Sequence, residues 1–274
     1  MLIEARGLRL SLPDRGRPGS LLRPSRPIEI LKGVDFAVAP GEAVGIVGES
    51  GSGKTTLGRV LIRLLRPTAG TLVFDGQDIA TCGEDVLRPL RPRLQMIFQN
   101  PLSSLNPRRR VRDIVAAPLA AAGVPDDGTK VMTALARAGL GPDFAGRYPH
   151  QLSGGQRQRV GIARAIVTEP AFILADEIVS GLDVSTQAQI LILLRDLARE
   201  MGLALAFIAH DLSVVRVLCD RVAVMLQGRI VEDGPCGEIF DNPRHPYTRR
   251  LIRAIPLPEI DDGWLDNPEA MEEA

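Results

Sequence analysis

The segment Gly48–Thr55, which is GESGSGKT, carries the clearest chemical pattern in the chain. It fits GxxxxGK[ST], in which glycines let backbone N–H groups turn inward around a polyphosphate and a following helix adds its positive dipole end. An apolar run at 43–47 predicts a buried strand before it, and the spacing over 55–65 predicts a helix after it. We therefore expect Lys54 to reach the β- and γ-phosphates of a nucleotide and the Thr55 hydroxyl to ligate Mg²⁺. The expected nucleotide-binding residues are Gly48, Glu49, Ser50, Gly51, Ser52, Gly53, Lys54, Thr55 and Thr56.

A second candidate is the acidic pair Asp176-Glu177, which follows the apolar run 172–175. Acids at the carboxyl end of a buried strand lie where α/β proteins bind ligands. Asp176 is expected to hold Mg²⁺, directly or through water, and Glu177 to polarise an attacking water. Taken alone, the pair also fits a strand end followed by a solvated turn. The phosphate-binding segment Gly48–Thr55, called the phosphate loop from here on, favours the catalytic interpretation.

A third pattern is Leu152-Ser153-Gly154-Gly155-Gln156, which precedes a predicted helix over 156–167. Two glycines at a helix start expose N–H groups, so this is a second anion-binding helix end. One chain with one phosphate loop has no evident use for it, unless it faces a nucleotide held by another subunit. The alternative is a plain helix cap made by Ser153.

In this order, the three patterns resemble the ABC ATPase family, and nearly the whole chain follows its pattern. The resemblance implies that Gln99 is the Q-loop glutamine, which touches Mg²⁺ and links the ATP site to a membrane subunit. It implies that 180–183 is the D-loop and that His210 is the switch histidine at the γ-phosphate. A histidine there also fits a simple strand end. The expected catalytic residues are thus Glu177, His210, Gln99 and Lys54, and the expected Mg²⁺ ligands are Thr55, Gln99 and Asp176.

Two further segments, 100–108 and His245-Pro246-Tyr247-Thr248, resemble the ATPase subunits of oligopeptide, dipeptide and nickel importers. The resemblance implies two ATPase subunits that close around two ATP molecules, with Ser153, Gly154, Gly155 and Gln156 of each reaching the other's nucleotide. A paralogous second subunit is favoured over an identical one. Two integral permease subunits and, indirectly, a solute-binding protein complete the expected assembly, on the cytoplasmic face of the inner membrane. The alternatives are an accessory ATPase of the phosphonate-breakdown type and a soluble non-transport ABC ATPase.

The sequence departs from the family at two places. Relatives usually stack adenine on an aromatic residue before the phosphate loop, but no aromatic or histidine residue precedes Phe36 here. Leu10 or Leu12 would occupy that region, or an arginine of the loop 13–27 would replace the stacking. The usual Pro-Thr after the catalytic glutamate is Ile178-Val179, which we expect to alter the turn but not the chemistry.

The elements that must position these residues indicate an α/β fold, because apolar strand patterns alternate with helical ones. The resemblance makes it a P-loop NTPase with a mainly parallel core sheet, an N-terminal antiparallel β subdomain and an inserted α-helical subdomain. We expect an ATPase domain over about 1–260, with the helical subdomain at about 100–165 and a family-type C-terminal extension at about 235–260. The acidic tail 261–274 offers little to bury and is expected to be loosely ordered.

Composition excludes several function classes. The formal net charge is +0, which argues against a nucleic-acid partner. The 3 cysteines match no zinc or iron–sulfur spacing and are expected to be free thiols. No apolar run approaches the roughly 18 residues of a membrane span, and the opening MLIEARGLRL is charged too early for a signal peptide.

Overall fold

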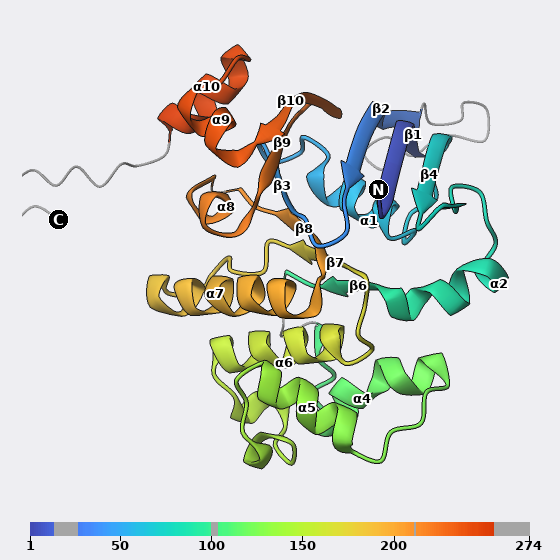
Figure 1. The fold of residues 1–274 in the computed structure, drawn as a ribbon, viewed down its shortest axis with the longest axis vertical. Helices are drawn as coiled ribbons and strands as arrows, with labels where there is room; N and C mark the ends of the chain where they lie inside the picture. The colour runs from blue at the N-terminus through green and yellow to red at the C-terminus, as the bar shows by residue number, and fades with distance from the viewer. Residues whose placement is uncertain (14–26, 100–103, 211, 255–274) are drawn as a thin grey trace, which may run out of the picture.

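The computed structural model describes residues 1–13, 27–99, 104–210 and 212–254, which form two β-sheets and the helices around them (Figure 1). The strands are β1 (Ile3–Pro13), β2 (Pro27–Val38), β3 (Ala43–Val47), β4 (Ala69–Phe74), β5 (Gln77–Asp78), β6 (Leu94–Ile97), β7 (Phe172–Asp176), β8 (Ala204–Ile208), β9 (Arg221–Leu226) and β10 (Arg229–Pro235). The α-helices are α1 (Lys54–Leu61), α2 (Glu84–Leu87), α4 (Val111–Ala122), α5 (Thr129–Arg137), α6 (Gly154–Ile166), α7 (Val184–Met201), α8 (Leu212–Leu218), α9 (Cys236–Asp241) and α10 (Pro246–Arg253). Short 3₁₀ segments cover 88–93, 142–144 and 149–151.

The central sheet has six strands in the order β10-β9-β3-β8-β7-β6. Every residue of β3, β7 and β8 is buried, as expected for aliphatic strands covered on both faces. The strands from β9 to β6 pair in parallel, whereas β10 pairs antiparallel with β9. The carboxyl ends of the parallel strands therefore lie along one edge of the sheet.

The two faces of this sheet pack into different cores, because side chains alternate along a strand. Leu174 of β7 and Ile208 of β8 join a core with α1 and the small N-terminal sheet. Ile173 and Phe207, one residue away on the same strands, join a core with α6, α7 and α8. The sheet is thus sandwiched between helix α1 with the small sheet on one side and the remaining large helices on the other.

The small sheet has the strand order β2-β1-β4-β5, and all its pairings are antiparallel. The expected fold class, a parallel core sheet with an N-terminal antiparallel β subdomain and additional helices, is confirmed by this arrangement. In Figure 1, α4, α5 and α6 form a layer on the far side of α7 from the sheets. Helix α6 packs against α4, α5 and α7, so it joins this layer to the rest of the molecule.

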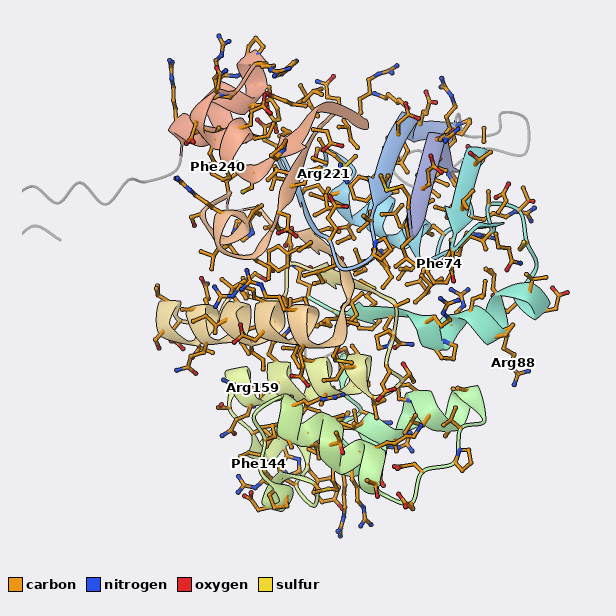
Figure 2. The ribbon with its side chains drawn as sticks, viewed as in Figure 1. Phe74, Arg88, Phe144, Arg159, Arg221 and Phe240 are labelled. Atoms are coloured by element: carbon orange, nitrogen blue, oxygen red, sulfur yellow. The ribbon has the colours of Figure 1, made fainter. Side chains whose placement is uncertain are left out.

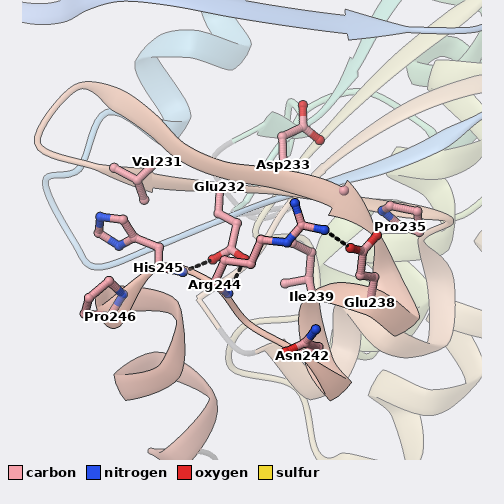
Figure 3. Close-up of a pocket in the computed structure, with 11 residues that line it drawn as sticks. Val231, Glu232, Asp233, Pro235, Glu238, Ile239, Asn242, Arg244, His245 and Pro246 are labelled. Carbon is pink, nitrogen blue, oxygen red and sulfur yellow. Dashed lines mark hydrogen bonds and ion pairs between the residues drawn. The ribbon is translucent and has the colours of Figure 1, made fainter.

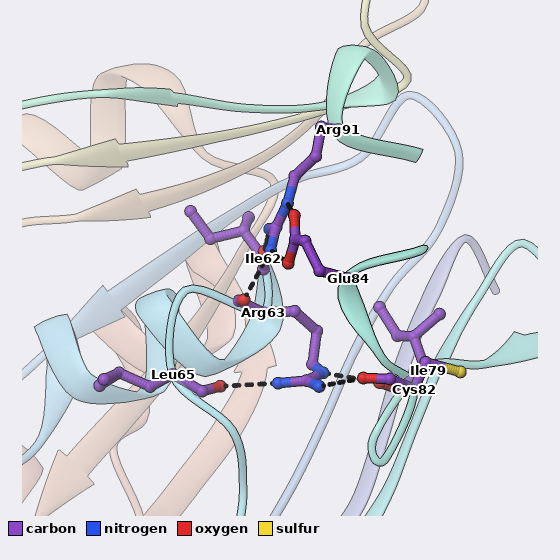
Figure 4. A network of polar contacts seen from close by, with 7 residues as sticks. All are labelled: Ile62, Arg63, Leu65, Ile79, Cys82, Glu84 and Arg91. Atoms are coloured by element: carbon purple, nitrogen blue, oxygen red, sulfur yellow. Dashed lines mark hydrogen bonds and ion pairs between the residues drawn. The ribbon is translucent and has the colours of Figure 1, made fainter. Parts of the chain in front are cut away.

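Helix α1 ends at Leu61, earlier than the helix expected over 55–65. The reason is Arg63, which adopts a left-handed backbone conformation with φ 53°. Its buried guanidinium donates from Nε to the carbonyl of Ile79 at 2.6 Å and from Nη2 to that of Cys82 at 2.9 Å (Figure 4). These bonds to distant residues give the carbonyl groups of Ile79 and Cys82 hydrogen-bond donors. They end helix α1 at this point, although the sequence pattern favours its continuation.

Arg221, which Figure 2 labels, is the first residue of β9 and therefore lies at the opposite end of the parallel strands from the phosphate loop, where it joins three segments. Its guanidinium donates to Glu42 Oε1 at 2.8 Å, to Asp233 Oδ2 at 2.7 Å and to the carbonyl of Ala37. This half-buried network connects β2 to the β9–β10 hairpin and so fixes the small sheet against the large one.

Some expectations fall outside the described residues. They concern the acidic tail 261–274, most of the loop 13–27 and the first part of the segment 100–108. Among the residues that the structure describes, no helix combines the length and the apolar character that crossing a membrane requires.

Candidate functional site

Four neighbouring parallel strands end at one edge of the central sheet, and each is followed by a residue singled out from the sequence. β3 leads into the loop that starts at Gly48, and β8 is followed by His210. β7 ends at Asp176 with Glu177 next, and β6 is followed by Gln99. Residues far apart in the sequence therefore meet because their strands are adjacent and point the same way.

The phosphate loop between β3 and α1 borders a cavity of about 260 Å³. Helix α1 begins after Gly53, which is left-handed with φ 106°, and no side chain caps its first turn. An uncapped helix N-terminus that faces a cavity is suited to bind an anion. The residues around the cavity are Ile30, Ser50, Gly51, Gly53, Lys54, Thr55, Thr56 and Glu177.

Gly48 shows why the loop needs glycine at its first position. Its φ of 144° lies in a region that side chains rarely adopt, and an added Cβ would lie 2.2 Å from the carbonyl oxygen of Met225. The close approach of β9 to the loop thus leaves no room for any side chain there.

The Lys54 ammonium lies inside the loop. Its Nζ donates to the carbonyl oxygens of Gly48 at 2.6 Å and Glu49 at 2.9 Å. Burial lowers the pKa of Lys54, while the nearby Glu177, Asp176 and Glu49 carboxylates oppose this change. A cation that is poorly hydrated and rests on loop carbonyls is placed to bind a phosphate entering the cavity.

Thr55 and Asp176 place two oxygen atoms that could ligate a metal ion next to each other beside the cavity. The Thr55 hydroxyl donates to Asp176 Oδ1 at 3.1 Å, and Asp176 as a residue is only 3% exposed. Burial raises the pKa of Asp176, and the hydrogen bond from Thr55 partly offsets that increase. Hydroxyl and carboxylate oxygens next to a phosphate site are the ligands that Mg²⁺ prefers, so these residues fit the ion.

Glu177 and Gln99 are in direct contact. Gln99 Nε2 donates to Glu177 Oε2 at 2.7 Å. Glu177 has φ 47°, and its backbone N–H donates to the carbonyl of Ile208 at 3.0 Å. A left-handed glutamate is unusual, and such strained positions often occur at active sites. Glu177 borders both the loop cavity and a second cavity of about 170 Å³ that His210 also lines.

The Ser153–Gln156 segment is built differently. Ser153 caps α6: its hydroxyl accepts from the Gln156 N–H at 3.3 Å, and Gln156 Oε1 accepts from the Ser153 N–H at 3.0 Å. A Cβ on Gly155 would lie 2.6 Å from Thr186 Cγ2, so the tip of α6 sits directly on the start of α7. Ser153 and Gly154 are exposed, and none of the four residues borders the loop cavity.

Two family models match this chain. Residues 31–180 match the ABC transporter model, and residues 231–273 match the model for the oligopeptide/dipeptide transporter C-terminal region. The chain belongs to the ABC transporter family. Its fold and the order of its phosphate loop, Ser153–Gln156 segment and acidic pair agree with this membership.

Relatives and solved structures extend this finding. The chain is 51% identical over 243 residues to a peptide import ATP-binding protein of Brucella ovis, covering 86% of this chain and 76% of the relative. It is 47% identical over 260 residues to the oligopeptide transport ATP-binding protein AppF of Bacillus subtilis, covering 93% and 78%. A dimeric ATP-binding cassette bound to ADP and Pi matches with a TM-score of 0.74 at 30% identity, covering 85% of this chain and 98% of that chain. The cbiO1 subunit of the Clostridium perfringens transporter complex cbiONQ matches with a TM-score of 0.76 at 28% identity, covering 88% and 91%.

The expected ABC ATPase of the oligopeptide/dipeptide group, with its P-loop fold, is therefore confirmed. The same relatives favour an importer subunit over an accessory or non-transport ATPase. This ABC ATPase binds and hydrolyses ATP, and it acts as the cassette of a membrane transporter. The Mg²⁺ ion and the roles of individual residues stay predictions.

Sequence reasoning missed two residues at this ABC cassette's nucleotide site. Ile30 of β2 borders the loop cavity, and Tyr247 contacts the phosphate loop from the C-terminal helix α10. Neither contact has a local signal, because each joins residues far apart in the chain. Of the two leucines considered in place of an adenine-stacking aromatic, Leu10 is buried in the core and Leu12 is 36% exposed.

Proposed function

We propose that this chain is one of two ATPase subunits that drive a peptide importer, and that each ATP is enclosed between the two subunits. One observation carries the proposal: the sheet edge gathers Lys54, Asp176, Glu177 and His210, while the Ser153–Gln156 tip, with Ser153 and Gly154 exposed, lies outside that site. A preformed anion-binding helix tip that cannot serve its own nucleotide is suited to serve that of a neighbour.

In the proposed mechanism, the loop N–H groups and Lys54 bind the phosphates of ATP. Glu177, oriented by Gln99, accepts a hydrogen bond from the attacking water and aligns it with the γ-phosphorus. His210 donates to the γ-phosphate from the neighbouring strand end. A bound Mg²⁺ would neutralise phosphate charge, and Thr55, Gln99 and Asp176 are the residues that would hold it.

The tip of α6 completes the site from the other subunit. Its exposed N–H groups and the Ser153 hydroxyl add hydrogen-bond donors to the γ-phosphate only when the subunits close. Closure therefore assembles the full set of catalytic groups, and ATP hydrolysis allows the two subunits to separate again. We propose a paralogous second subunit; an identical one gives the same geometry.

The remaining assembly follows from this function. We propose the division into an ATPase domain at about 1–260 with a helical subdomain at about 100–165, which faces two permease subunits together with the Gln99 region. The proposed extension at about 235–260 and nearly all of the proposed tail 261–274 fall within residues 231–273, the part that matches the importer-type C-terminal region. The subunit would lie on the cytoplasmic face of the inner membrane, with a solute-binding protein delivering cargo outside. Relatives described as peptide importers favour peptide over nickel as the cargo.

The test is Glu177→Gln, which keeps the shape of the side chain and its contact with Gln99 but removes the charge. ATP turnover should fall by about 10²–10⁴-fold, the usual contribution of a general base. ATP binding should persist, and size-exclusion chromatography with ATP should show the variant subunits held together as dimers, in the presence of the second subunit if it is a paralogue.

Glu169→Gln is the matched control, because Glu169 is an exposed residue that precedes the opposite end of β7. It should leave turnover and dimer formation unchanged. A Glu177→Gln subunit with normal turnover would remove Glu177 from the proposed role.

A further inference from the structure

Tyr247 connects the C-terminal helix α10 to the phosphate loop. Its hydroxyl oxygen accepts a hydrogen bond from the backbone N–H of Glu49 at 2.8 Å, across 198 positions of sequence. The side chain is 2% exposed and is among the largest fully buried ones in the described chain. A buried tyrosine hydroxyl usually finds a polar partner, and here the partner belongs to the ATP site.

The start of α10 is held firmly against β10, as Figure 3 shows. The Glu232 carboxylate of β10 accepts from the backbone N–H groups of Arg244 at 2.7 Å and His245 at 3.0 Å. His245 Nδ1 then accepts from the Tyr247 N–H at 3.1 Å, which caps the helix. These bonds hold the start of α10 in place and so fix the position of the buried Tyr247 ring beside the phosphate loop.

The peptide unit between Gly48 and Glu49 carries two hydrogen bonds that point in opposite directions. Its N–H donates to Tyr247, and its carbonyl oxygen accepts from Lys54 Nζ at 2.6 Å. A trans peptide is planar, so the direction of the N–H sets the direction of the carbonyl. Gly48 has no side chain to restrict this plane, and its φ of 144° is accessible to glycine.

We propose that Tyr247 is a positioning residue for ATP binding, which holds the Gly48–Glu49 peptide so that its carbonyl orients the Lys54 ammonium toward the phosphates. The inference rests on the proposed phosphate-binding role of Lys54. Tyr247 itself does not border the loop cavity. The C-terminal helix α10 thereby contributes to nucleotide affinity by fixing the orientation of the Gly48–Glu49 peptide.

Tyr247→Phe tests this directly, because phenylalanine keeps the buried ring and removes only the accepting oxygen. The Kd of the isolated subunit for ADP and for ATP should rise about fivefold, the effect of losing one ordinary hydrogen bond. The effect should disappear when Lys54 is already alanine, since a double-mutant cycle detects only groups that act through each other.

Tyr148→Phe is the matched control: it removes the hydroxyl of the chain's other tyrosine, which precedes the Ser153–Gln156 segment. Its nucleotide affinity should equal that of the wild type. An unchanged Kd in Tyr247→Phe overturns the proposal, and so does an equal loss in the presence and absence of Lys54. Failure of the wild-type subunit to bind ADP would instead contradict the proposed nucleotide site.

Discussion

The N-termini of helices α1 and α6 are both glycine-rich and both lack acidic residues in the first turn, yet they are stabilised in opposite ways. The tip of α1 has no side-chain cap and adjoins the buried charges of Lys54 and Asp176. The tip of α6 is capped by its own Ser153 and Gln156 and is exposed to solvent. The α1 tip leaves backbone N–H groups without a side-chain acceptor, as a ligand-binding helix end does, whereas the α6 tip already has its acceptors within the chain.

This difference has an energetic meaning. Buried charged groups without full solvation reduce the stability of the folded chain, and binding of an oppositely charged ligand recovers part of that cost. A satisfied helix cap adds to stability whether or not a ligand is present. Removing a functional side chain should therefore have opposite effects on folding at the two helix tips.

Lys54→Ala should produce the largest effect on binding at the α1 tip. Loss of a charge-assisted hydrogen bond to phosphate weakens binding by roughly 1.5–3 kcal/mol, which is at least about tenfold in Kd. Isothermal titration of the isolated subunit with ADP measures this change. Lys130→Ala, an exposed lysine at the start of α5, is the matched control and should bind ADP normally.

Ser153→Ala should separate the two tips by leaving ADP binding to the isolated subunit unchanged. The substitution removes the α6 cap, so the free energy of unfolding should fall by about 0.5–1 kcal/mol, as measured by urea denaturation. ATP turnover in the assembled transporter should fall as well, because the tip serves the second subunit's nucleotide. A weakened ADP affinity of the isolated subunit would show that the two tips are not independent.

The sequence identifies both tips but not the contrast between them. Local patterns place the phosphate loop between a strand and a helix and place Asp176 at a strand end, because glycine spacing and apolar runs act over a few residues. The early end of α1 depends on bonds from Arg63 to distant carbonyls. Helix α4 continues through Pro118, although a proline inside a helix removes one backbone hydrogen bond. The Tyr247–Glu49 bond depends on how the last helix packs, which no local pattern contains.

Asp176→Asn should give the smallest effect, a change in the stability of the folded chain. At neutral pH this change should have the opposite sign to that of Ser153→Ala. Burial raises the pKa of Asp176 above its ordinary value of 3.8, so at pH values between 3.8 and the folded-state pKa the folded protein holds a proton that the unfolded chain has released. Stability from this group is therefore full below pH 3.8 and is lost as pH rises through the folded-state pKa. Asparagine keeps an acceptor for Thr55 but carries no charge.

The Tm of nucleotide-free Asp176→Asn should accordingly exceed that of the wild type at pH 8, by about 2–4 °C for each kcal/mol recovered, and the difference should vanish toward pH 4. Asp183→Asn gives the reverse comparison, because hydrogen bonds from Ser185 and Thr186 lower the pKa of Asp183 to about 2. The charge of this exposed α7 cap contributes stability above the unfolded pKa, and that contribution is lost as pH falls, so removing the charge should lower Tm at pH 8. If both variants lose stability at pH 8, burial of the Asp176 carboxylate does not destabilise the folded chain. The proposed energetic difference between the α1 tip and the α6 tip would then be wrong.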